Sequence, residues 1–212
     1  CAQSLWNTNW NDDLIVPGSL KEIISFLNKY NPNLLVVNSQ SFNQKGIIEN
    51  SRVPLKNNIV YSKKQDNEFL EHFSPYLSFI GGIVVYKALW IENFDKRKIG
   101  TYFAHLDVIL KIKINREVHY LAKECIQMRV GSQTWTNKSF EIWNINFAKI
   151  IWDLKNYDNI SKNKVTTKYP FHSPRSLLSS RAYGRINLNV WKKIIYKSKK
   201  ISIFFKFFIL II

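Results

Sequence analysis

The sequence predicts an α/β fold, and two kinds of segment predict it. Residues 19–30 carry apolar side chains at helical spacing. Residues 34–37 and 76–86 are apolar runs bounded by turn residues, which is typical of buried strands. The chain has 212 residues, of which 46% are hydrophobic, and this is enough for one packed domain with a small appendage.

The first predicted helix follows two adjacent carboxylates, Asp12 and Asp13, and a Pro-Gly turn. Ser19 is predicted to cap this helix with its hydroxyl, and Glu22, three residues on, would complete a capping box. The two carboxylates are therefore expected at the end of one element, at the edge of a cleft.

The next part of the chain is polar and then apolar. Residues 38–69 are predicted to form an irregular surface excursion with short strands at most, and residues 64–74 are compatible with a helix. In the predicted strand 76–86, the adjacent Gly81 and Gly82 indicate either a packing bulge or the close approach of a ligand.

The second half of the chain also contains segments typical of helices and of strands. We expect a helix or a strand-to-helix junction at 102–112, a strand at 117–130 and a strongly amphipathic helix at 135–154. Residues 156–174 are polar and predict a linker, and residues 175–200 return to a basic helical pattern.

Residues 201–212 are nearly all apolar but too short to cross a bilayer, which takes about 20 residues. Together with the basic helix before them, they fit an anchor that lies in the plane of a membrane and meets anionic lipid. A helix packed on the domain is the alternative.

The formal net charge of +16 favours anionic partners such as nucleic acid, phosphorylated ligands or acidic lipid, unless it reflects a general preference for lysine. No nucleic-acid-binding module is recognisable, so nucleic acid is not the partner that we expect. Cys1 and Cys125 are too few for a disulfide framework and lack the spacing of a metal site, so we expect a reducing compartment, the cytoplasm.

Residues 11–20 have the sequence Asn-Asp-Asp-Leu-Ile-Val-Pro-Gly-Ser-Leu, and they resemble the acidic motif of family 2 glycosyltransferases and the helix after it. Residues 79–87 look like the glycine-bearing strand of that family, and residues 104–111 look like its last motif. Within the family, residues 99–105 and 129–143 are similar to the abequosyltransferase-like enzymes that assemble surface polysaccharides such as O-antigen.

The resemblance implies the C-terminal portion of a GT-A domain, with a mixed sheet and C-terminal amphipathic helices. Residues 1–155 would be a partial catalytic domain, and residues 156–212 a helical region that associates with a membrane. The βαβ unit with which the family binds the nucleotide base has no counterpart before Asp12, so we expect a fragment or an inactive remnant.

The resemblance also implies an inverting transfer of a sugar, such as a deoxyhexose, from a nucleotide-sugar donor. Asp12 and Asp13 would hold a divalent metal, Mg²⁺ or Mn²⁺, that neutralises the diphosphate leaving group. His105 stands where the family places its catalytic Asp and would be the general base, since a neutral imidazole accepts a proton near pH 7. Alternatively, Asp107 is the base and His105 belongs to the core.

Four further residues are assigned to the substrates. Gly81 and Gly82 would let substrate approach the backbone, and Arg129 would meet phosphate unless it is an ordinary surface arginine. Trp135 would stack on a sugar of the acceptor unless it is a core residue. The expected acceptor is a polysaccharide or a lipid-linked glycan, and the expected location is peripheral, at the inner face of the cell membrane. A basic nucleic-acid-binding protein remains the alternative function.

Overall fold

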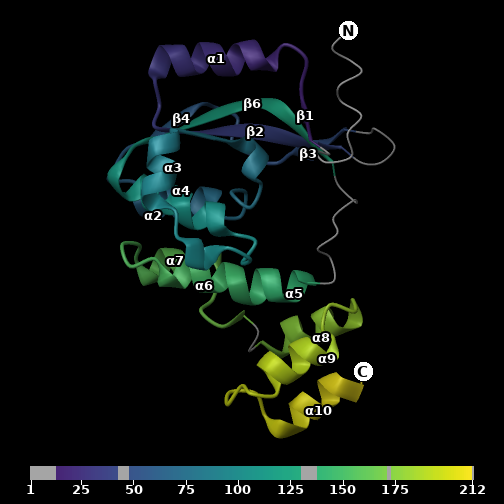
Figure 1. The fold of residues 1–212 in the computed structure, drawn as a ribbon. Coiled ribbons are helices and arrows are strands. Elements are labelled where there is room, and N and C mark those ends of the chain that lie inside the picture. The colour runs from purple at the N-terminus through teal and green to yellow at the C-terminus, as the bar shows by residue number, and fades with distance from the viewer. Residues whose placement is uncertain (1–12, 43–47, 130–137, 171–172, 212) are drawn as a thin grey trace. The chain divides into compact units, whose positions relative to one another are not determined.

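The computed structural model describes residues 13–42, 48–129, 138–170 and 173–211. The chain divides into two compact units (Figure 1). The first unit is Cys1–Asn93 with Val108–Ser132, and the second is Phe94–Asp107 with Gln133–Ile212.

The first unit contains a mixed sheet built on one central parallel pair, β2 (Leu34–Phe42) and β6 (Val118–Arg129). Two short antiparallel strands line the outer edge of each central strand. On β6 these are β1 (Leu14–Ile15) and β4 (Ile59–Tyr61), and on β2 they are β3 (Ile48–Ser51) and β5 (Ile83–Val85). An α/β fold with a mixed sheet is therefore confirmed.

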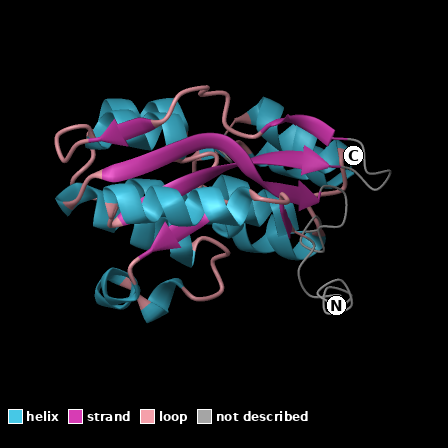
Figure 2. Cartoon of the chain, turned by 90° about the horizontal axis from the view of Figure 1, so that it is seen from above, coloured by secondary structure: helices cyan, strands magenta, loops and turns pink. Residues whose placement is uncertain are grey.

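One face of this sheet is covered by α1 (Ser19–Tyr30), as Figure 1 and the view from above in Figure 2 show. Ile23 of α1 is buried among side chains that alternate along the two central strands. These are Leu35, Val37, Leu121, Cys125 and Ile126. The predicted helix thus packs Ile23, Phe26 and Leu27 against the sheet that contains the predicted strand at 34–37. Leu20 and Ile24, which belong to the predicted apolar stripe, are exposed.

The prediction of a capping box at the start of α1 is wrong. The cap is Gly18, whose φ of 83° lies in the left-handed region that glycine adopts without steric cost, and no side chain caps the helix. Ser19 is instead buried in the first turn. Glu22 forms an ion pair with Lys123 of β6, so it supports the packing of α1 on the sheet.

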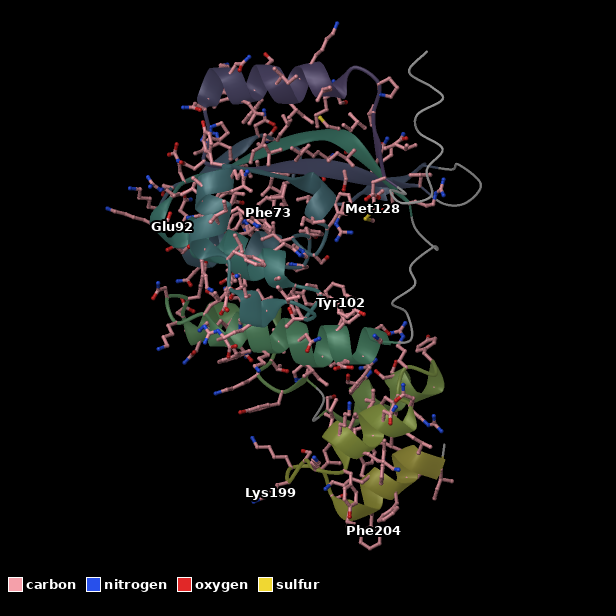
Figure 3. All side chains as sticks on the ribbon, viewed as in Figure 1. Phe73, Glu92, Tyr102, Met128, Lys199 and Phe204 are labelled. Atoms are coloured by element: carbon pink, nitrogen blue, oxygen red, sulfur yellow. The ribbon has the colours of Figure 1, made fainter. Side chains whose placement is uncertain are left out.

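The other face is covered by an aromatic cluster that involves α2 (Asp66–Phe73). The rings of Phe69 and Phe73 stack with their centroids 5.1 Å apart, and Phe73 lies 5.0 Å from Tyr120 of β6 (Figure 3). Tyr61 of β4 packs edge-on to both phenylalanines. The excursion at 38–69 is therefore less irregular than expected, because it extends β2 and adds two strands.

The prediction of a strand over residues 76–86 is mostly wrong. Only Ile83–Val85 is extended, and Ile80–Gly82 form a 3₁₀ turn. The reason is the close packing of this turn against the sheet, since a β-carbon on Gly82 would lie only 2.7 Å from the carbonyl oxygen of Val37. The helix expected next is present as α3 (Lys87–Asn93).

Helices α4 to α10 follow, and the first of them, α4 (Ala104–Asn115), begins in the second unit and ends in the first. The predicted amphipathic helix is described from Ser139 onward and contains a π-helix. Its segments are α5 (Ser139–Glu141), the π-helix Ile142–Phe147 and α6 (Ala148–Asp153). The remaining helices are α7 (Asn159–Val165), α8 (Pro174–Ala182), α9 (Leu188–Val190) and α10 (Ile203–Ile211).

Two predictions for this half of the chain are corrected. The expected linker at 156–174 contains α7, which begins because the Asp158 carboxylate accepts a hydrogen bond from the amide of Ser161. The expected helix at 175–200 is broken near Gly184, whose φ is 67°. The pieces pack around a common core that includes Phe140, Leu177, Trp191, Ile195 and Ile209.

Lys113 of α4 is fully buried in the first unit, and we expect it to be essential for stability. Its Nζ donates 2.7 Å hydrogen bonds to Asp66 Oδ1 and to the carbonyl oxygen of Ser62. Lys113→Ala would leave that carboxylate without its cation, which costs about 3–5 kcal/mol of unfolding free energy in urea titrations. Lys21→Ala, at an exposed position of α1, is the control and should cost less than about 0.5 kcal/mol. A Lys113→Ala cost as small as that of the control would contradict the prediction.

Candidate functional site

The carboxyl ends of β2 and β6 lie at one edge of the first unit's sheet, because the two strands are parallel. In α/β sheets, ligands bind preferentially at this edge. Two of the predicted site residues lie there. Asp13 immediately precedes β1, which pairs with the end of β6, and Arg129 is the last residue of β6.

Arg52 is the polar residue that organises this edge, and the sequence did not reveal it. It directly follows β3, and its backbone amide donates to the carbonyl oxygen of Ser39 at 2.7 Å. Its Nη2 donates to Ser78 Oγ at 2.8 Å, and its guanidinium lies 5.5 Å from the centre of the Phe79 ring. Arg52 thereby ties β3 to the segment that leads into the glycine turn.

The guanidinium of Arg52 also meets the end of β6. Its Nη1 lies 3.4 Å from Sδ of Met128, the residue that Figure 3 labels at that end. Burial lowers the pKa of Arg52, and the charges of Tyr76 and Asp13 act in the opposite direction. Among the described residues, the buried Nε of Arg52 has no hydrogen-bond partner. A guanidinium presents several donors in a planar fork, and this geometry suits the oxygens of a phosphate.

Arg129 lies on the same edge and is exposed. Its guanidinium lies 5.5 Å from the ring of Phe42, with which it is paired across the two central strands. Arg129 therefore places a cation beside an aromatic ring at the exposed end of β6.

Gly81 and Gly82 lie in the turn next to this edge, where their neighbours are protein atoms. A β-carbon on Gly81 would come within 2.6 Å of the ring of Phe79, and one on Gly82 would meet the backbone of Val37. A cavity of about 10 Å³ remains between this turn, Arg52 and β2, which is about the room for one water molecule. Close packing of the turn therefore accounts for the absence of a side chain at both positions.

His105 and Asp107 belong to the second unit and lie in the first turn of α4. Both are buried, with exposed fractions of 9% for His105 and 2% for Asp107. The ring of His105 lies 6.4 Å from that of Phe103, which packs in turn against Trp143 and Phe147. The side chain of His105 is thus held by an aromatic cluster and keeps slightly more access to solvent than Asp107.

The turn before His105 has an unusual backbone. Gly100 has a φ of 84°, and Tyr102, labelled in Figure 3, has a φ of 68°. A positive φ is strained for a residue with a side chain, and such strain tends to occur at functional sites. The segment 99–105, which carries the narrower family resemblance, is therefore a strained turn that opens a helix.

The remaining predicted residues, Asp12 and Trp135, lie outside the described residues. In the parts of the chain that are described, no group of three or more His, Cys, Asp or Glu side chains is arranged to hold a metal ion. Asp13 is a hard oxygen donor, and Mg²⁺ typically takes only one or two protein carboxylates together with phosphate oxygens and water. The donor chemistry at Asp13 therefore fits a metal that arrives with a phosphorylated ligand, and it does not form a closed protein cage.

Known proteins give little guidance for this chain. No protein-family model matches the sequence, and no curated protein matches it either. Among solved structures, the chain is similar to residues 1–349 of S. aureus TarS in complex with UDP-GlcNAc, with 16% sequence identity and a TM-score of 0.42. The similarity covers 86% of this chain and 50% of that one, so the chain spans about half of the length of that structure. A likeness at this level supports no conclusion about fold or function.

Proposed function

We propose that the protein is a glycosyltransferase that moves a sugar from a nucleotide-sugar donor. The observation that carries the proposal is that Asp13, the guanidinium of Arg52 and the strand end at Arg129 all lie at the carboxyl ends of the central strands. A carboxylate and two guanidiniums at this edge suit a metal-bound diphosphate, which is the group that such a donor releases. Residues 11–20, which resemble the acidic motif of family 2 glycosyltransferases and the helix after it, contain β1 of the same edge.

The individual roles follow from the chemistry of each residue. Asp12 and Asp13 would hold a divalent metal, Mg²⁺ or Mn²⁺, which would supply positive charge for the leaving diphosphate. Arg52 and Arg129 bind phosphate oxygens. His105 takes the proton from the attacking hydroxyl of the acceptor, and the attack inverts the anomeric carbon. Trp135 contacts the sugar of the acceptor.

The resemblance to abequosyltransferases favours a deoxyhexose as the sugar and a surface polysaccharide or a lipid-linked glycan as the acceptor. Such an acceptor places the enzyme at the inner face of the cell membrane. No helix among the described residues is both long enough and apolar enough to span a bilayer. We propose a peripheral association because of an exposed surface of the second unit, which the next subsection describes.

Binding of nucleoside diphosphates tests the proposal. In calorimetric titrations with UDP, GDP, CDP and dTDP in the presence of Mg²⁺, we expect one of them to bind. Arg52→Lys keeps the charge but loses the planar fork of donors, so we expect about 10-fold weaker binding. Asp13→Asn should weaken the binding of Mn²⁺ in the presence of that nucleotide, as measured by electron paramagnetic resonance.

Arg116→Lys is the matched control, because Arg116 is exposed in the same unit. It should leave nucleotide affinity unchanged. Thermal unfolding of each variant separates a loss of binding from a loss of fold. The proposal fails if the wild-type protein binds none of the four nucleotides, or if a bound nucleotide has the same affinity for wild type and for folded Arg52→Lys and Asp13→Asn.

A further inference from the structure

The positive charge of the chain is concentrated at its C-terminal end. Asp158 is the last acidic residue, and residues 159–212 contain nine lysines and three arginines. This stretch therefore carries twelve of the sixteen net positive charges. A general preference for lysine does not explain this distribution, because the remaining residues contain all of the acidic groups.

Within this stretch, α10 is held in place by one apolar stripe. Phe205 and Ile209 of α10, four residues apart, pack into the core of the second unit together with Ile201, which precedes the helix. The indole Nε1 of Trp191 donates to the carbonyl oxygen of Lys206 at 2.9 Å, and Lys206 Nζ donates to that of Tyr196 at 2.8 Å. The orientation of α10 on its own unit is thus fixed by packing and by hydrogen bonds.

The opposite side of α10 is also apolar, but it faces outward. Phe204, Phe207, Phe208 and Ile211 follow the spacing i, i+3, i+4 and i+7, so they form a second stripe. Their exposed fractions are 86%, 47%, 49% and 83%. Figure 3 shows Phe204 projecting from the helix into open space. Exposed aromatic and aliphatic side chains gathered in this way are typical of an interaction surface.

We propose that this stripe, together with Lys199 and Lys200, docks on the surface of an anionic lipid bilayer. We call these six residues the α10 surface. The phenyl and isoleucine side chains would enter the boundary of the acyl chains while the lysines meet the lipid phosphates. Because the inner stripe already fixes α10 on its unit, docking requires no folding step, and the helix lies in the plane of the membrane.

Charge and chemistry favour a bilayer over other partners. A second copy of the chain would bring twelve more positive charges to the same place, with no acidic residue in this stretch to offset them. A nucleic acid would neutralise the lysines but would leave the isoleucine and much of the phenylalanine stripe in water. An anionic membrane satisfies the positive charge and the apolar stripe together.

Flotation with vesicles tests the proposal. The protein should float with vesicles of phosphatidylcholine and phosphatidylserine and stay in solution with vesicles of phosphatidylcholine alone. The triple variant Phe204→Ser, Phe208→Ser, Ile211→Ser should reduce binding by about 100-fold, since three apolar side chains no longer enter the lipid. Lys199→Gln with Lys200→Gln should reduce vesicle binding by about 30-fold, because each lysine near an anionic surface contributes to binding.

Two matched controls use residues outside the α10 surface. Ile160→Ser, Tyr183→Ser and Leu188→Ser together remove three exposed apolar side chains from the same unit, and Lys63→Gln with Lys64→Gln removes two exposed charges from the other unit. Both should bind like wild type. Equal binding of wild type and the folded α10 triple variant would overturn the proposal. Failure of the wild type to bind anionic vesicles, or a self-association or oligonucleotide binding that the triple variant alone abolishes, would also overturn it.

Discussion

Replacing Asn38 by alanine is expected to lower the free energy of unfolding by about 3–5 kcal/mol, because several buried hydrogen bonds are lost together. Asn38 is 1% exposed and lies where the pairing of β2 with β6 shifts register, between Val37 and Ser39. A bulge of this kind leaves backbone groups without strand partners. The Asn38 side chain satisfies them.

Both ends of the Asn38 amide are used. Its Oδ1 accepts from the amides of Ser39 at 2.9 Å and Val53 at 3.0 Å. Its Nδ2 has two hydrogens to donate, and three acceptors lie within hydrogen-bond distance of it. These are Ser51 Oγ at 2.8 Å and the carbonyl oxygens of Ala122 at 3.0 Å and Val53 at 3.1 Å. The bulge also carries the end of β6 toward β1 and the candidate site. Loss of Asn38 should therefore weaken nucleotide binding as well as stability.

Asn58→Ala is the matched control for Asn38→Ala. Asn58 is exposed, and its Oδ1 accepts one bond, 2.9 Å long, from the amide of Ala122 at the same bulge. We expect Asn58→Ala to lower the free energy of unfolding by about 1 kcal/mol. Both variants are measured by urea titrations followed by circular dichroism. If Asn38→Ala costs no more than this control, the side chain of Asn38 is not what holds the bulge.

Elements with a strong local pattern could be predicted from the sequence, and elements with long-range partners could not. The helix at 19–30 and the strands that begin near residues 34 and 117 are confirmed, because their apolar periodicity is local. Gly81 and Gly82 interrupt an apolar run that resembles a strand, and only their contacts with β2 and Phe79 explain the turn. Tertiary packing overrode local propensity there.

The same limit applies to the candidate site. Asp13 was predicted as a site residue because it belongs to a recognisable acidic motif. Arg52 and Asn38, in contrast, lie in the polar stretch 38–69, which has no apolar periodicity. Their partners are distant in sequence, since Asn38 reaches Ala122 and Arg52 reaches Met128. No sequence spacing indicates such pairs. A buried amide or guanidinium in a long polar excursion is recognised only when the sheet that surrounds it is known.

His105→Ala is expected to reduce kcat of sugar transfer by about 10²–10⁴-fold, the usual contribution of a general base. Transfer is measured with the sugar donor of the nucleotide that binds in calorimetry. His105 is favoured over Asp107 because it is less buried, at 9% against 2% exposed, so a hydroxyl of the acceptor reaches it with less rearrangement. Added imidazole should restore part of the rate of His105→Ala, which a purely structural role of the side chain would not allow.

Two further variants decide whether His105 or Asp107, both in the first turn of α4, is the general base. Asp107→Asn keeps the shape of the side chain, and we expect less than about a 10-fold loss in kcat if His105 takes the proton. His72→Ala removes an exposed histidine of the first unit, whose Nδ1 lies 2.9 Å from the hydroxyl of Tyr61, and it should leave transfer unchanged. Loss of activity in Asp107→Asn, with full activity in His105→Ala, would assign the base to Asp107. The strained backbone at Tyr102 would then position the carboxylate of Asp107 and not the imidazole of His105.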